Sequence, residues 1–192
     1  MSAFKKSIEA YAQYVVEEAK KNLLAENKGD GSLYKSLSYI IKQNRASGKY
    51  DTGYTIQFEM EDYGLFVDEG VKGKDPSEVS PNAKIKGQQA PNSQYKFGSG
   101  SKKGTFKLFS KKMSRWAQER NIRFRDEKGR FKKGGYDSMG YIIAKNIYNR
   151  GIRPTMFFTK PFEAGLDKFN DDIAVSYIKD IDSIFSRFEK LQ

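Results

Sequence analysis

The chain has 192 residues, a length that fits one domain of ordinary size with a buried core. It contains neither cysteine nor histidine, which excludes disulfides, thiol nucleophiles, imidazole bases and nearly every zinc or haem site. Its 35 lysine and arginine residues outnumber 24 aspartate and glutamate residues, and the formal net charge of +11 favours a polyanionic partner. No apolar run approaches the roughly 20 residues of a membrane-spanning helix, so we expect a soluble protein without a membrane partner.

The positive charge is concentrated in one part of the sequence. Residues 84–133 contain sixteen lysines and arginines but only three acids, which is a net charge of +13. The rest of the chain therefore sums to −2. This distribution indicates a basic segment added to a nearly neutral protein.

The N-terminal third predicts a helix followed by a β-hairpin. Apolar residues recur every three or four positions across residues 3–26, with charged residues between them, as in an amphipathic helix. A short helical turn is expected at residues 32–37, with Ser32 as its N-cap. Strands are expected at residues 38–45 and 52–60, joined by a turn, and apolar and polar residues alternate in the second strand.

The middle of the chain predicts little regular structure. Residues 71–105 are rich in glycine, proline and polar residues and have few apolar anchors, so we predict a long loop or arm. A helix is expected from its cap at Ser110 onward, and Trp116 on that helix is expected to belong to the core. Residues 123–132 are expected to form a small basic hairpin that turns at residues 128–129.

The C-terminal part predicts two helices. The first is expected to be capped by Asp137 or Ser138 and to end at Gly151, with an extended core segment at residues 154–158 after it. Pro161 suits the first turn of a long closing helix. The apolar stripe of that helix consists of Phe169, Ile173, Tyr177, Ile181, Ile184, Phe185 and Phe188.

These elements predict an α+β fold, a small antiparallel sheet flanked by amphipathic helices, with a long basic loop or arm insertion. We expect a single domain over residues 1–192. The insertion is placed at residues 71–109, and the basic hairpin at residues 122–135.

Two groups of residues are candidates for chemistry. The glycine- and lysine-rich stretches at residues 72–74 and 98–104 lack the spacing and the flanking strand and helix of a phosphate-binding loop. Asp68 and Glu69 carry oxygen ligands suited to Mg²⁺, but adjacent residues on a strand point to opposite faces. We therefore predict no catalytic residue, no metal site and no cofactor.

The basic segment has three interpretations that its charge does not separate. Cations interleaved with aromatic rings are what a nucleic-acid groove uses, for phosphates and for stacking. The same composition describes an arm that wraps an acidic neighbouring protein, or a solvated charged loop. The interleaved rings are Tyr95, Phe97, Phe106, Phe109, Phe124 and Phe131.

Four segments, taken in chain order, go beyond composition: GSLYKSL at residues 31–37, YGLFVDEG at 63–70, WAQERNI at 116–122 and YIIAKNIYNRGIRPTMFF at 141–158. The last fits the pattern aliphatic, Ala, basic, x, Ile, then Gly-Ile-x-Pro and a Phe-Phe pair. In this order the segments resemble the tail-completion and neck-protein family of long-tailed bacteriophages, the connector proteins of the head–tail junction. The resemblance marks these residues as structural: Tyr63, Glu69, Gly70, Trp116, Gly151, Pro154, Phe157 and Phe158.

The resemblance implies a virion protein of the neck or tail, made in the host cytoplasm, that forms a ring of its own copies around the DNA channel without catalysis. Its implied partners are other connector, portal or tail proteins, with non-specific contact to packaged DNA as a further option. The alternative is a free basic nucleic-acid-binding protein, and a metal-dependent nuclease is a weaker third. The candidate DNA-channel or partner contacts are Lys102, Lys103, Lys107, Lys111, Lys112, Arg123, Arg125, Arg130, Lys132 and Lys133.

Overall fold

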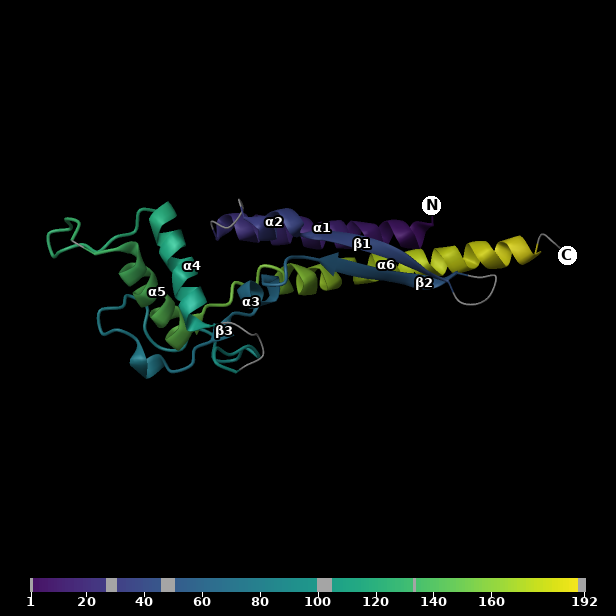
Figure 1. Ribbon diagram of the computed structural model, residues 1–192. Helices are drawn as coiled ribbons and strands as arrows, with labels where there is room; N and C mark the ends of the chain where they lie inside the picture. The colour runs from purple at the N-terminus through teal and green to yellow at the C-terminus, as the bar shows by residue number, and fades with distance from the viewer. Residues whose placement is uncertain (1, 27–30, 46–50, 100–104, 133, 190–192) are drawn as a thin grey trace. The chain divides into compact units, whose positions relative to one another are not determined.

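The computed structural model describes residues 2–26, 31–45, 51–99, 105–132 and 134–189. The backbone divides into two compact units: unit 1 comprises Met1–Gly64 and Met156–Gln192, and unit 2 comprises Leu65–Thr155. Within the described residues, helices combine with short antiparallel sheets, so the fold is α+β as predicted (Figure 1). No helix in these ranges is both long and apolar enough to cross a membrane.

Unit 1 is built on two helices that lie side by side, α1 (Ala3–Ala25) and α6 (Thr159–Glu189) (Figure 1). They run antiparallel, since the backbone N–H of Ala3 at the start of α1 bonds Asp180 near the end of α6. The amphipathic pattern predicted for residues 3–26 is confirmed, because one stripe of α1 is buried. That stripe consists of Ile8, Tyr11, Ala12, Val15, Val16, Ala19 and Leu23.

The predicted hairpin is present in unit 1. Strands β1 (Ser38–Arg45) and β2 (Asp51–Glu59) pair antiparallel, while the predicted turn at residues 46–49 lies outside the described residues. One face of β2 packs on aromatic rings, as shown by Phe58, whose ring centroid lies 5.3 Å from that of Phe158. Thr55 and Gln57, which alternate with this face along β2, are exposed, as the predicted one-sided sheet requires.

A distant residue, not the predicted serine, stabilises the start of α2 (Ser32–Ser36). Gly31 occupies the N-cap position and makes no side-chain hydrogen bond. The backbone N–H of Leu33 instead donates to the Tyr63 hydroxyl at 3.1 Å, and the hydroxyl of Ser32 lies 2.8 Å from the same oxygen. The prediction of Ser32 as N-cap was therefore wrong, because a tertiary partner supplies the acceptor.

Unit 2 contains two closely packed helices, α4 (Phe106–Glu119) and α5 (Tyr136–Arg150). A Cβ atom placed on Gly140 of α5 would lie only 2.3 Å from the backbone nitrogen of Ser114 on α4. The absence of a side chain at Gly140 thus permits the close approach of the two backbones. Each helix also contributes a fully buried alanine to unit 2: Ala117 and Ala144.

Helix α4 begins earlier than predicted. Its N-cap is Thr105, whose Oγ1 accepts a hydrogen bond from the backbone N–H of Leu108 at 3.2 Å. Ser110 lies inside the helix, and so its assignment as the cap was wrong. Lys107, which lies before Ser110, therefore belongs to a helix and not to a loop.

Helix α5 begins without a side-chain cap and ends as predicted. Gly135 is its N-cap residue, and the two predicted caps, Asp137 and Ser138, lie within its first turn. At the other end Gly151 has a φ of 93°, a conformation that residues with a Cβ rarely adopt. The predicted helix end at Gly151 is confirmed.

The segment after Gly70 is anchored to the rest of unit 2 at several points. Strand β3 (Val71–Lys72) pairs antiparallel with β4 (Gly151–Ile152), and a single turn, η1 (Pro76–Glu78), follows. The buried hydroxyl of Ser93 donates to the backbone oxygen of Gly70 at 2.8 Å. The segment has little regular structure, as predicted, but it has more anchors than its composition indicated.

The segment before α6 forms a turn where a core strand was predicted. Phe157 and Phe158 are in a turn, and Met156 before them has a positive φ of 54°. Phe157 is nevertheless fully buried, as a core residue should be. Pro161 lies in the first turn of α6, as predicted, because its missing N–H needs no partner there.

Candidate functional site

The two units differ sharply in charge. Unit 2 contains twenty-one lysines and arginines and eight acids, a net charge of +13, whereas unit 1 has a net charge of −2. The basic segment found in the sequence thus belongs entirely to one compact unit. The candidate site is therefore a surface of unit 2.

The exposed face of α4 is the most regular basic surface in the described part of unit 2. Lys107, Lys111 and Arg115 follow one another at intervals of four residues and so lie on one side of the helix, with Lys112 beside them. All four side chains are exposed. None of them makes a hydrogen bond or an ion pair with another described residue.

Sequence reasoning singled out three of these cations and missed the fourth. Lys107, Lys111 and Lys112 were predicted as contact residues, but Arg115 was not. Its four-residue spacing from Lys111 is a helical signal that was present in the sequence. Both residues already lay within the helix predicted from Ser110 onward, so this signal did not depend on where the helix begins.

The hairpin that follows α4 uses its arginines to hold its own structure. The Nε of Arg123 donates to the Tyr136 hydroxyl at 2.9 Å, and its guanidinium lies 5.3 Å from the centroid of the Phe131 ring. Arg125 lies 4.4 Å from the same ring centroid and donates to the backbone oxygen of Gly129 at 2.9 Å. These cations are thus engaged within unit 2.

The remaining hairpin cations are placed as follows. Arg130 forms an ion pair with Asp126, with its Nε 2.9 Å from the carboxylate. The predicted turn is present, since Gly129 has a φ of 77° and the backbones of Arg125 and Phe131 form an antiparallel β-bridge. Lys132 is exposed. Three predicted contact residues lie outside the described residues: Lys102, Lys103 and Lys133.

Trp116 does not belong to the core as predicted. Its side chain is 37% exposed on α4, and the Arg120 guanidinium lies 5.3 Å from the ring. The helix buries smaller residues, Ser114 and Ala117, because the backbone of α5 approaches too closely for an indole. The ring therefore adds an aromatic element to the surface that also displays the α4 cations.

Two segments of the family resemblance meet in unit 2. Helix α3 (Gly64–Asp68) leads to Gly70, whose φ is 74°, and a Cβ there would lie 2.5 Å from the backbone oxygen of Ile152. The same Cβ would lie 2.7 Å from the nitrogen of Pro154. The hydroxyl of Thr155 also donates to the backbone oxygen of Val67 at 2.8 Å. Residues 63–70 and 141–158 are thus neighbours in space.

The other residues of the resemblance have structural roles as well. Glu69 accepts hydrogen bonds from the Gln94 side chain at 2.9 and 3.1 Å. In unit 1, the backbone oxygen of the buried Phe157 accepts a hydrogen bond from the side chain of Asn22 at 3.2 Å, which ties α1 to the start of α6. Phe158 contacts the ring of Phe58.

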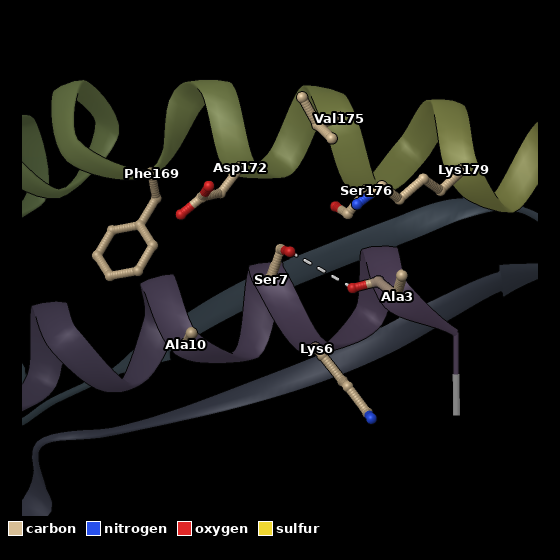
Figure 2. Close-up of a pocket in the computed structure, with 9 residues that line it drawn as sticks. All are labelled: Ala3, Lys6, Ser7, Ala10, Phe169, Asp172, Val175, Ser176 and Lys179. Atoms are coloured by element: carbon tan, nitrogen blue, oxygen red, sulfur yellow. Dashed lines mark hydrogen bonds between the residues drawn. The ribbon is translucent and has the colours of Figure 1, made fainter.

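A groove between α1 and α6 is the larger of the two described cavities, with a volume of about 370 Å³ (Figure 2). Small residues line much of it, among them Ala3, Ser7 and Ala10 on α1. Figure 2 shows the Lys6 side chain directed away from α6, and the one hydrogen bond drawn runs from the Ser7 hydroxyl to the backbone oxygen of Ala3. The polar groups do not converge on a common point, so we assign no ligand to this groove.

Arg150 at the end of α5 was not singled out from the sequence. Its Nε is buried and makes no hydrogen bond with any residue that the structure describes. Burial lowers the pKa of the Arg150 guanidinium below its ordinary value. The side chain lines a cavity of about 210 Å³ together with Lys84, Ile85 and Asn146 among others.

The carboxylates that could suit Mg²⁺ do not gather. Asp68 is buried, and Glu69 is engaged with Gln94. Among the described residues there is no group of three or more acids placed to hold a metal ion.

No protein-family model matches the chain, and neither a curated protein nor a solved structure matches it. The resemblance to neck and tail-completion proteins therefore depends on the four segments and on their order. Any function assigned to the chain depends on its own residues.

Proposed function

We propose that the protein is a structural subunit of a tailed-bacteriophage particle, a neck or tail-completion protein that assembles into a ring at the head–tail junction around the DNA channel. In this role it acts by assembly and catalyses no reaction. Its partners are further copies of itself and other connector, portal or tail proteins.

The observation that supports this proposal most directly is the contact between the two longest segments of the resemblance. Gly70 and Gly151 both have positive φ angles. A Cβ on Gly70 would lie 2.5 Å from the backbone oxygen of Ile152 in the other segment, and one on Gly151 would lie 2.2 Å from the backbone oxygen of Val71, the residue directly after the first segment. Two segments that are far apart in sequence, and that both resemble the same family, thus pack so closely that they constrain each other sterically. This mutual dependence is what a shared structural scaffold requires.

Unit 1 provides a surface suited to a subunit contact. Helix α6 exposes large apolar residues along much of its length. Two of them, Val175 and Tyr177, also border α1, whereas Ile178 and Phe185 are the most exposed. An apolar helix face in water is characteristic of a protein-binding surface. The exposed residues are Leu166, Val175, Tyr177, Ile178 and Phe185.

The acidic character of α6 favours another copy of this chain as the occupant. The helix contains seven acids and four basic residues, whereas unit 2 has a net charge of +13. A head-to-tail contact between unlike surfaces is the type of contact that closes into a ring. The α6 face and a basic part of unit 2 in the next copy are complementary in this sense.

Mass photometry and negative-stain images of the purified chain test the proposal. We expect ring-sized particles of uniform mass. The paired substitution Ile178→Asp and Phe185→Asp should abolish them while leaving the circular dichroism spectrum unchanged, because both side chains are more than half exposed. The control pair Lys160→Gln and Lys179→Gln changes the net charge by the same amount and should still assemble.

A chain that stays monomeric at every salt concentration, alone and with DNA, would contradict the ring proposal. It would favour the second candidate function, a free nucleic-acid-binding protein, which the charge of unit 2 also supports. Such a protein should show DNA affinity that falls steeply between about 50 and 200 mM salt without forming any larger species.

A further inference from the structure

We infer that the exposed face of α4 binds the phosphate backbone of nucleic acid. The face consists of Lys107, Lys111, Lys112 and Arg115. The inference rests on the proposed function only where it places this face along the DNA channel of the ring. In a free nucleic-acid-binding protein, the second candidate function, the same face would be the DNA-binding surface.

The geometry of α4 presents these cations as one array. At about 100° per residue, the four side chains fall within an arc of about 140°, less than half of the helix circumference. From Lys107 to Arg115 the helix rises about 12 Å. Duplex DNA carries about seven phosphate charges along that length, counting both strands, so every cation of the array can find a phosphate.

The residue types favour nucleic acid over a protein partner. Three of the four cations are lysines, and lysine is depleted in protein–protein interfaces because its ammonium group is strongly hydrated. Lysine contacts phosphate as a point charge without requiring a fixed geometry. Glu119 is the only acid in α4, so acidic side chains do not neutralise the array from within the helix.

The size of the net positive charge of unit 2 also favours nucleic acid as the partner. A contact with unit 1 of another copy offers a net charge of −2 against the +13 of unit 2. Most of the positive charge would remain unneutralised, and copies gathered in one assembly would repel each other. A polyanion can offset the excess.

The hairpin cations are less suitable for this role, although their charge alone makes them equal candidates. Arg123 and Arg125 are engaged with Phe131, and Arg130 is paired with Asp126. Binding to phosphate would have to compete with these contacts. The α4 cations make no such contact with the described residues, so they are free to bind phosphate.

The experiment measures binding of the full chain to a short labelled DNA duplex by fluorescence anisotropy, at salt concentrations between about 50 and 200 mM. The α4 variant combines Lys107→Gln, Lys111→Gln, Lys112→Gln and Arg115→Gln. The matched control, which loses the same charge from exposed positions of the same unit, combines Lys74→Gln, Lys84→Gln, Lys86→Gln and Lys96→Gln. Thermal unfolding of each variant checks that it is folded.

We expect the α4 variant to lower the slope of log affinity against log salt by up to about 3.6, which is 0.9 for each lost phosphate contact. The control should lower it by less than about 1. Duplexes of unrelated sequence should bind alike, because phosphate contacts carry no sequence information. Equal losses in both variants, or no loss in the α4 variant, would overturn the inference.

Assembly of the same variants, followed by mass photometry, separates this inference from the proposed function. An α4 variant that still forms rings but binds DNA weakly supports the inference. An α4 variant that binds DNA normally and fails to assemble would overturn it and would assign the face to a subunit contact. A wild-type chain that binds DNA through α4 but forms no ring would overturn the ring proposal alone.

Discussion

Asp180 caps the N-terminus of α1, because its Oδ1 accepts a hydrogen bond from the backbone N–H of Ala3 at 3.0 Å. Its Oδ2 accepts a second from the N–H of Phe4 at 3.1 Å. The carboxylate belongs to α6, more than 170 residues later in the chain. Burial alone would raise the pKa of Asp180, but these backbone donors hold it below its ordinary value. One side chain thus joins the two long helices of unit 1.

We expect Asp180→Ala to destabilise the protein by about 1 kcal/mol, since it leaves two N–H groups in the first turn of α1 without this acceptor. The depressed pKa means that the stabilisation is complete above the ordinary carboxyl pKa of about 4 and is lost as the pH falls through the folded-state pKa. The difference in urea midpoint between wild type and variant should therefore shrink in acid. A difference that stays constant down to about pH 2 would show that the carboxylate charge contributes nothing.

Tyr11 predicts a loss of stability in alkali. It is almost fully buried on α1, and burial raises the pKa of its hydroxyl to about 12. Since an unfolded tyrosine titrates near 10, its contribution is complete below about pH 10 and is lost as the pH rises through about 12. Between pH 9 and pH 11, the urea midpoint should fall more for wild type than for Tyr11→Phe. The midpoint of the control Tyr14→Phe should fall about as much as that of wild type. An equal fall in all three proteins would contradict the assignment to Tyr11.

Gly140→Ala should destabilise unit 2 even though alanine is the better helix former by about 1 kcal/mol. The new Cβ would lie 2.3 Å from both the backbone nitrogen and the Oγ of Ser114. We expect a net cost of about 1 to 3 kcal/mol, which is a fall in Tm of several degrees. Ser138→Ala, at an exposed position of the same helix, should change Tm little. A stabilised Gly140→Ala would mean that α4 and α5 are farther apart.

Gly151 should tolerate substitution less well than another glycine with a similar φ angle. Gly151 and Gly129 have φ angles of 93° and 77°, but a Cβ on Gly151 would lie 2.2 Å from the backbone oxygen of Val71, whereas one on Gly129 would meet nothing within 4 Å. Gly129→Ala should cost about 1 kcal/mol for its backbone conformation alone. Gly151→Ala, and Gly151→Val more so, should cost clearly more. Equal thermal shifts at the two positions would refute the close contact.

Deleting residues 74–105 should disrupt unit 2, contrary to what the composition of this loop indicates. The deletion removes the buried hydrogen bond from Ser93 to Gly70 and the contact of the Phe97 ring with the ring of Tyr148 on α5. We expect lost protection of α5 amides in hydrogen exchange, with a smaller effect from Ser93→Ala. Unchanged protection of α5 in the deletion variant would show that the loop is dispensable for folding.

The sequence by itself determined the elements that depend on local periodicity. The amphipathic pattern located α1, the alternation in β2 indicated a one-sided sheet, and Gly151 marked the end of α5. These signals are local, because side-chain direction follows the backbone repeat of a helix or a strand. The concentration of positive charge in one segment also follows from the sequence alone, since it requires only counting along the chain.

Only the tertiary structure decided which side chains meet. At the start of α2 the backbone N–H of Leu33 donates to the hydroxyl of Tyr63 and not to a Ser32 cap. Trp116 is at the surface because Gly140 allows the backbone of α5 to pack against α4. The hairpin arginines are occupied by rings that only folding places beside them, whereas Arg115 remains exposed on α4. Each of these outcomes depends on contacts between distant residues, which are set by the packing of whole elements and are not encoded in any local pattern.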